Sequence, residues 1–188
     1  MPRDHRRLIE QAELPGEGRV LEVGCGTGNL TLLAKRSCPG AELVGIDPDP
    51  LALARATRKA KGMPGVRFDR GCGQRLPYPD ASFDRVLSSL MLHHLDPTVG
   101  HQTLTEAARV LRPGGSLHVM DVDGHGGAVH AILAKTLRRS HHQHHGLGDV
   151  IPTALRDAGF GEVTRHGHRR TWFGGLGFYR AAVGTRTR

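Results

Sequence analysis

Val20-Leu21-Glu22-Val23-Gly24-Cys25-Gly26-Thr27-Gly28 joins an apolar run to three closely spaced glycines. The apolar run predicts a buried strand, and the pattern of residues 29–37 predicts a helix directly after it. Glycine lets the backbone turn tightly and approach a ligand where any Cβ would clash. The first turn of the helix also presents free N–H groups. The stretch therefore predicts a strand, loop and helix that bind a ligand at the loop.

The glycine spacing is G-x-G-x-G, whereas the dinucleotide fingerprint is G-x-G-x-x-G. Asn29 stands where the third glycine of that fingerprint would be, which favours a ligand without a pyrophosphate. Asp47 ends the next predicted strand, 23 residues after Gly24. A carboxylate there can accept hydrogen bonds from both ribose hydroxyls. Loop and acid together predict a nucleoside site; the alternative is an ordinary tight turn with a helix cap at Asp47.

Strands and helices alternate along the first 123 residues. The predicted strands are residues 19–23, 41–46, 66–68, 83–88 and 116–122. The predicted helices are residues 3–14, 29–37, 50–61 and 101–112. A short helix at 152–157 and a closing pair of strands at 160–166 and 171–183 follow. This alternation predicts an α/β fold with a parallel sheet and helices on both of its faces.

The chain has 188 residues, which suits one domain. No apolar run reaches the roughly 18 residues that a membrane span needs. The first seven residues carry charge with no apolar segment behind it, so we expect no secretory signal. The three cysteines form no metal-type pair and are odd in number, which suits a reducing cytoplasm. We therefore expect a single cytoplasmic domain spanning residues 1–188.

The formal net charge of +8 is concentrated in the last third of the chain. Residues 124–188 hold 10 of the 26 Lys and Arg residues but only 3 of the 18 Asp and Glu residues. Such a field favours an anionic substrate, a nucleic acid or an acidic membrane surface. A solubilising surface without a specific partner is the other interpretation.

The sequence resembles the class I S-adenosylmethionine (SAM) dependent methyltransferases, in particular the methyltransferase type 11 group that includes ubiquinone and menaquinone biosynthesis enzymes. The matching stretches, within residues 18–123, are VLEVGCGTGNLT, VGIDPDPLALARA, LPYPDASFDRVLSSLMLHHL and VLRPGGSLHVMD. The resemblance implies a Rossmann-like, doubly wound sheet of about seven strands, mostly parallel, with an antiparallel C-terminal edge. It also implies SAM as the cofactor and S-adenosylhomocysteine as its product.

The resemblance assigns residues to the SAM site. Those matching Glu22, Gly24 and Gly26 lie along the methionine end of SAM. The residue matching Asp47 binds the ribose. The cofactor-binding residues implied in this way are Glu22, Gly24, Cys25, Gly26, Gly28, Asp47, Pro48, Cys72, Gly73, Ser88 and Ser89.

Two features depart from the family pattern. The family usually has Gly-Asp before its L-P-F sequence, and here Gly71-Cys72 precedes Leu76-Pro77-Tyr78. Cysteine is a poor acceptor for the adenine amino group. Either Gln74 or backbone groups replace the contact, or binding loses roughly 0.5–1.5 kcal/mol. The N-terminal helical segment, within residues 1–15, is also short, so either the cap over the site is truncated or the site is open.

Histidines supply the candidate catalytic bases. His93 and His94 follow the fourth strand, near the edge where doubly wound sheets bind ligands. Histidine titrates near neutral pH, as a base should, although a purely structural role is the alternative. His125 is a further candidate. The cluster His141, His142, His144 and His145 lacks a completing Cys, Asp or Glu nearby, and we expect no metal site.

Four aromatic residues near the C-terminus allow two interpretations. Trp172, Phe173, Phe178 and Tyr179 either line a substrate pocket or pack the closing strands against the sheet. Residues 124–148 are expected to form part of the substrate cover.

The predicted function is methyl transfer from SAM to an O, N or C atom of a small acceptor, anionic or lipophilic. The alternatives are a nucleic-acid methyltransferase that uses the basic C-terminal third and a non-catalytic SAM-binding protein. Ser88-Ser89-Leu90-Met91 stands where a base-modifying enzyme would carry N/D-P-P-Y/F, and aromatic residues for base stacking are few. Both points disfavour the nucleic-acid alternative. The sequence leaves the oligomeric state open.

Overall fold

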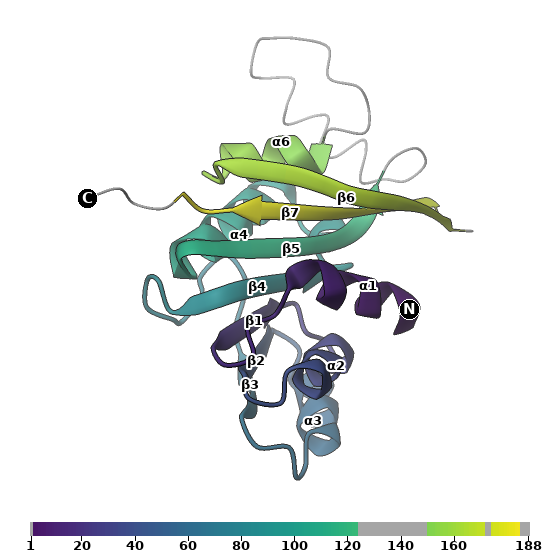
Figure 1. Ribbon diagram of the computed structural model, residues 1–188, viewed down its shortest axis with the longest axis vertical. Helices are drawn as coiled ribbons and strands as arrows, with labels where there is room; N and C mark the ends of the chain where they lie inside the picture. The colour runs from purple at the N-terminus through teal and green to yellow at the C-terminus, as the bar shows by residue number, and fades with distance from the viewer. Residues whose placement is uncertain (1, 124–149, 172–173, 185–188) are drawn as a thin grey trace.

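Seven strands form one sheet in the order β3-β2-β1-β4-β5-β7-β6 in the computed structural model, which describes residues 2–123, 150–171 and 174–184 (Figure 1). The strands are β1 (Arg19–Val23), β2 (Glu42–Asp47), β3 (Val66–Arg70), β4 (Phe83–Ser89), β5 (Leu111–Asp123), β6 (Glu162–Thr171) and β7 (Gly174–Ala182). The first five pair in parallel, and β7 pairs antiparallel with both β5 and β6. Strand order reverses between β1 and β4, so the loop after β1 lies where such sheets bind ligands.

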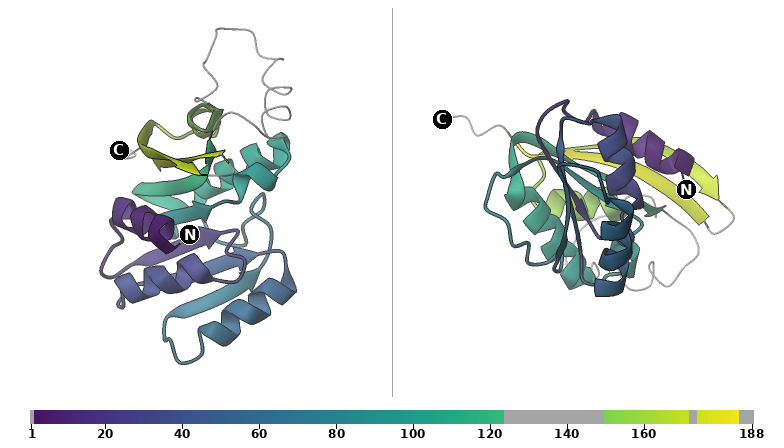
Figure 2. Two further views of the ribbon diagram at one scale, coloured as in Figure 1. Left: turned by 90° about the vertical axis from the view of Figure 1, so that its right-hand side faces the viewer. Right: turned by 90° about the horizontal axis from the view of Figure 1, so that it is seen from below.

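Helices cover both faces of the sheet (Figure 2). One face carries α1 (Pro2–Ala12), α2 (Asn29–Ser37) and α3 (Pro50–Lys59). The other carries α4 (Pro97–Val110) and α6 (Val150–Asp157), and a 3-10 turn, η1 (Leu92–His94), follows β4. This arrangement confirms the predicted doubly wound α/β class with its antiparallel C-terminal edge.

Two helices begin at the same local motif, an aspartate followed by proline. Asp49 accepts a hydrogen bond from Leu51 N at 2.8 Å, and Asp96 accepts one from Thr98 N at 2.9 Å. A carboxylate at the N-cap satisfies a free N–H, and proline is preorganised for the first helical position. The second of these caps starts α4 four residues earlier than the apolar periodicity alone predicts.

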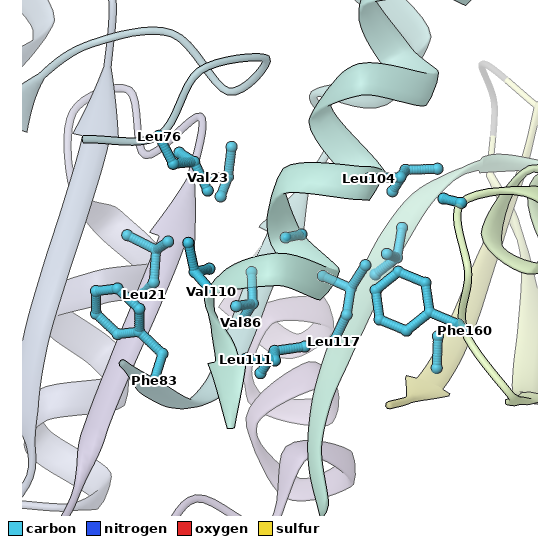
Figure 3. Packing of buried hydrophobic residues seen from close by; sticks show 14 of the residues in the cluster. Leu21, Val23, Leu76, Phe83, Val86, Leu104, Val110, Leu111, Leu117 and Phe160 are labelled. Carbon is cyan, nitrogen blue, oxygen red and sulfur yellow. The ribbon is translucent and has the colours of Figure 1, made fainter. Parts of the chain in front are cut away.

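Apolar side chains fill the sheet's two faces separately. Figure 3 shows the larger cluster, in which Leu21, Val86 and Leu117 of neighbouring strands pack with Leu104 of α4 and with Phe160. The opposite face packs Leu8 of α1 and Leu30 of α2 onto a second cluster. Strands that bury both faces read as continuous apolar runs, which is why β1 and β2 are recognisable in the sequence.

Several element boundaries differ from the prediction, most clearly in β5 and β6. The structure places the predicted turn Pro113-Gly114-Gly115 inside β5, where the register with β4 jumps from Phe83↔Leu111 to Arg85↔Ser116. Thr171 ends β6 and does not begin the last strand.

Among the described residues, no helix is long and apolar enough to cross a membrane.

Candidate functional site

The loop between β1 and α2 is held against β2 and is built from glycines in the left-handed region. Gly24 N and Cys25 N both donate to Ile46 O, at 2.9 and 3.1 Å. The φ angles of Gly24, Gly26 and Gly28 are 74°, 49° and 75°, which side chains with a Cβ rarely adopt. The loop therefore has a fixed shape that other residues would strain.

The three glycines face different surroundings. A Cβ on Gly24 would lie 2.4 Å from Met91 Cγ, and one on Gly28 would lie 2.7 Å from Phe68 Cζ. A Cβ on Gly26 would meet no atom within 4 Å. Gly24 and Gly28 are thus required by internal packing, whereas Gly26 exposes backbone to open space that a ligand can occupy.

Asp47, at the end of β2, points its carboxylate at this loop. Its Oδ2 accepts a hydrogen bond from Gly26 N at 2.8 Å, and its Oδ1 accepts one from Asp49 N at 2.9 Å. Each carboxylate oxygen has a second acceptor site, so both can still bind hydroxyl groups. Asp49 and not Asp47 caps α3, so the helix-cap alternative for Asp47 is wrong.

Glu22 lies beneath the loop and is 3% exposed. The Thr31 hydroxyl on α2 donates to its Oε2, and in the described ranges no basic side chain pairs with it. Burial raises the pKa of Glu22 to about 8; the Thr31 hydrogen bonds oppose this, and the charge of Asp47 adds to it. Glu22 is therefore largely protonated at neutral pH.

Cys25, Cys72 and Gly73 lie in different surroundings. Cys25 is buried, and burial, to which the charge of Asp47 adds, raises the pKa of its thiol, so it stays protonated. Cys72 is exposed in the loop after β3. A Cβ on Gly73 would lie 2.7 Å from Thr103 Cγ2, so helix packing requires that glycine.

Ser88 and Ser89 alternate between the two faces of β4, as neighbours in a strand must. Ser88 is buried, and its hydroxyl has no hydrogen-bond partner in the part of the chain that the structure describes. Ser89 Oγ lies 3.2 Å from His5 Nε2, on α1. Asp4 anchors that helix to β6 by accepting bonds of 2.8 and 2.9 Å from Arg169. The short N-terminal helix thus reaches the end of β4.

His93 and His94 have different environments. His93 Nδ1 lies 2.6 Å from Oδ1 of Asp121, which is 1% exposed. Because a carboxylate only accepts, His93 donates to it through Nδ1–H, and in the neutral ring with that hydrogen the acceptor nitrogen is Nε2. His94 is exposed, and its ring lies 3.9 Å from that of His93 between centroids.

Asp121, near the end of β5, is the residue of this pair that sequence reasoning missed. Its Oδ2 also accepts hydrogen bonds from Met91 N and Leu92 N, at 3.1 and 2.8 Å. Its Oδ1 accepts a further bond from Val122 N at 2.7 Å. Asp121 therefore fixes both the backbone of the turn after β4 and the orientation of the His93 ring.

The remaining predicted residues make none of the hydrogen bonds described above. Pro48 is exposed beside Asp47. Phe178 and Tyr179 are fully buried, so they pack the closing strands. The predicted substrate cover (residues 124–148) and the remaining candidates lie outside the described residues; these are His125, His141, His142, His144, His145, Trp172 and Phe173.

Sequence comparisons identify the class of protein that this fold and loop define. Residues 20–115 match a family model described as methyltransferase domain. Demethylmenaquinone methyltransferase of Thermus thermophilus is 38% identical over 118 residues, which are 62% of this chain and 52% of that protein. Its counterpart in Deinococcus radiodurans is 43% identical over 106 residues, 55% of this chain and 42% of that protein. The chain thus spans about half the length of these curated relatives.

Solved structures share the fold of the described residues. The [4+2]-cyclase SpnF superposes with a TM-score of 0.75 at 22% identity, covering 97% of this chain and 80% of that one. YcgJ from Bacillus subtilis gives 0.72 at 19% identity, covering 98% and 99%. The chain belongs to the methyltransferase domain family, and within it to the class I SAM-dependent methyltransferases of the type 11 group.

Proposed function

We propose that this protein binds SAM over the glycine loop and transfers its methyl group to a hydroxyl of a small or lipophilic acceptor. The single observation that carries the choice of a hydroxyl is the His93–Asp121 pair at the end of β4. An acceptor that must lose a proton needs a base, and a positioned imidazole supplies one.

The residues around the loop suit the donor. Gly26 leaves open space over its backbone, and Asp47 holds two acceptor oxygens beside it. In this proposal Asp47 binds the ribose, Pro48 lies against adenine, and Glu22 and Ser89 lie toward the methionine part. Leu51, in the first turn of α3, is 71% exposed and adds apolar surface near Pro48.

The chain's own residues then have to orient the acceptor and remove its proton. When bound, SAM supplies a methyl group that its sulfonium sulfur already activates. His93 Nε2 accepts the proton of the hydroxyl as the new O–CH3 bond forms, and later releases it to water. Asp121 holds the imidazole in the tautomer that can accept. Positioning of two reactants in this way can supply roughly 7–11 kcal/mol.

Replacement of Asp47 by alanine should weaken SAM binding by at least tenfold. The variant loses charged hydrogen bonds to ribose worth roughly 1.5–3 kcal/mol and also frees Gly26 N. Isothermal titration with SAM measures the effect. Asp49→Ala is the matched control: it removes a neighbouring carboxylate and the cap of α3 and should change affinity less than threefold. Equal losses in both variants would place the ribose elsewhere.

Replacement of Gly26 by alanine should abolish measurable SAM binding while leaving the protein folded. The new methyl group would occupy the open space above the loop and would also strain a residue with φ of 49°. Gly62→Ala provides the control, because Gly62 has φ of 83° and equally open space but lies after α3. Both variants should lose about 1–2 kcal/mol of stability. A folded Gly26→Ala protein with normal affinity would contradict the proposed placement.

Transfer is tested with methyl-labelled SAM and a panel of phenols, hydroxy acids, amines and RNA. Label in the phenols or hydroxy acids supports the proposal. Label in amines or in RNA instead would contradict the proposal that the acceptor is a hydroxyl of a small molecule. SAM binding with no transfer to any acceptor would favour a non-catalytic SAM-binding protein.

A further inference from the structure

The carboxyl group of Glu22 has no cationic partner within the described ranges, although it lies beneath the donor loop. Its surroundings there are the Thr31 hydroxyl, the Cys25 thiol and the carboxylate of Asp47. Its neighbours in the sheet are Gly45 of β2 and Leu87 of β4, neither of which carries charge. An isolated buried carboxylate is strongly disfavoured, so this environment favours the protonated acid.

The nearby bases are engaged elsewhere. Lys35, one turn after Thr31 on α2, donates to Pro39 O and Ala41 O at 2.7 and 2.6 Å. Lys59 of α3 is bound to Thr27 and Asn29 at the outer side of the loop. His5 of α1 is bound to Ser89, and burial lowers its pKa, which keeps it neutral. Among the residues that the structure describes, none of these bases supplies a positive charge to Glu22, and a bound ligand can.

We infer that Glu22 is the specificity residue that distinguishes the charged donor from its neutral product: it ionises when a sulfonium binds above it and takes up a proton again when the sulfur becomes a thioether. This inference rests on the proposed donor site. The sulfonium is the positive charge by which the donor differs from its product. S-adenosylhomocysteine has the same adenosine, carboxylate and amino group but no charge on sulfur.

The proton balance is simple. Binding of SAM to the protonated site releases one proton to solvent and leaves a carboxylate beneath a sulfonium. In the transfer step the sulfur keeps the electron pair of the broken C–S bond and becomes neutral, and the methyl group goes to the acceptor oxygen. Glu22 then takes a proton from solvent, and the product lies over a neutral acid. The pair of charges that strengthened donor binding no longer exists, so the product leaves more easily.

The direction of the pH effect follows from the free protein. Burial raises the pKa of Glu22 to about 8 before the ligand binds, and a bound cation lowers it. SAM should therefore bind more tightly as pH rises toward 8, by up to about tenfold per pH unit. The affinity for S-adenosylhomocysteine should not follow this trend. Both ligands carry the same amino group, so its titration changes both dissociation constants equally and cancels in their ratio.

The experiment is titration calorimetry of the full chain with SAM and with S-adenosylhomocysteine at pH 6, 7, 8 and 9. For the wild type, the ratio of the product's Kd to that of SAM should rise at least tenfold between pH 6 and 8. In Glu22→Gln, which keeps an acceptor for Thr31 but cannot ionise, the ratio should stay constant within about twofold. Glu42→Gln is the matched control at the exposed start of β2 and should behave as the wild type.

A second measurement needs no variant. At pH 7, the heats of SAM binding in phosphate and in Tris should differ by the difference between the ionisation heats of the two buffers, multiplied by about one released proton. The heat of S-adenosylhomocysteine binding should not depend on the buffer in this way. Binding of both ligands with a ratio that is independent of pH, and without proton release, would overturn the role of Glu22 and leave the donor site intact. If neither ligand binds the folded protein, the proposed function itself fails and this inference fails with it.

Discussion

His93→Asn should lower kcat for methyl transfer by about 10²–10⁴-fold while SAM binds with its wild-type affinity. Asparagine keeps a polar group that can donate to Asp121, but it presents no lone pair where Nε2 stands. The chemical step loses its base, and the donor site at the loop is untouched. Single-turnover transfer of labelled methyl to a phenol or hydroxy acid, alongside calorimetry with SAM, separates the two effects.

Asp121→Asn and His94→Asn test the assignment of His93 as the base, the first through its partner and the second through its neighbour. In Asp121→Asn, the amide oxygen would accept from Met91 N and Leu92 N. The amide nitrogen would donate to His93 Nδ1 and move the ring hydrogen onto Nε2, while Val122 N would lose its acceptor. The rate should then fall as far as in His93→Asn. His94 makes no hydrogen bond through its side chain within the described residues, so His94→Asn should keep kcat within about threefold. A slow His94 variant and a normal His93 variant would reverse the assignment.

The parts of the fold that the sequence predicts are those with strong local signals. Buried strands such as β1 read as apolar runs, and the glycine loop with its downstream acid defines the switch point of the sheet. The family resemblance adds the antiparallel edge. Boundaries were less predictable, because the bulge at Pro113-Gly114-Gly115 and the cap at Asp96 depend on pairing and hydrogen bonding that periodicity does not contain.

At the site, sequence reasoning located the elements but not the side-chain directions. It could not separate His93 from His94, since only the fold brings Asp121 next to one of them. A signal for Asp121 was nevertheless present: it lies near the end of a predicted strand next to β4, as Asp47 does next to β1. The three glycines of the motif look equivalent in the sequence. In the structure, a Cβ on two of them would meet packed side chains, and a Cβ on the third would meet open space.

The fold alone does not determine the reaction. A solved structure described as a [4+2]-cyclase superposes on 97% of the chain, so the same fold occurs in a protein named for chemistry other than methyl transfer. What differs between such proteins is the side chains at the carboxyl ends of the strands. In this chain those ends carry a carboxylate on β2 that accepts a hydrogen bond from the glycine loop and an oriented imidazole after β4. These two features together, and neither alone, support an enzyme that methylates a hydroxyl.

A buried histidine remote from the loop should make the protein sensitive to acid. His118 of β5 is 1% exposed; Gln11 donates to its Nδ1 at 3.3 Å, and its Nε2 donates to Ser116 Oγ at 2.9 Å. Gln11 also donates to Tyr179 O at 2.9 Å, so this network ties α1 to β5 and β7. Burial lowers the pKa of His118 to about 3, and the charges of Arg85, Arg180 and His166 add to the shift.

The unfolded chain protonates this histidine near its ordinary pKa of about 6.5, whereas the folded chain does so only near pH 3. The stabilising contribution is therefore complete above pH 6.5 and falls by up to about 1.4 kcal/mol per unit as pH decreases toward 3. Between pH 7.5 and 4.5, urea unfolding should show the wild type losing about 2–3 kcal/mol more than His118→Asn, which keeps an acceptor for Gln11 but cannot take up a proton. Acidic groups that also titrate are common to both proteins and cancel. His101→Asn, at an exposed position on α4, should lose as much as the wild type. Equal losses in the wild type and His118→Asn would mean that this histidine is protonated in the folded state, and that α1 is held to the sheet by other contacts.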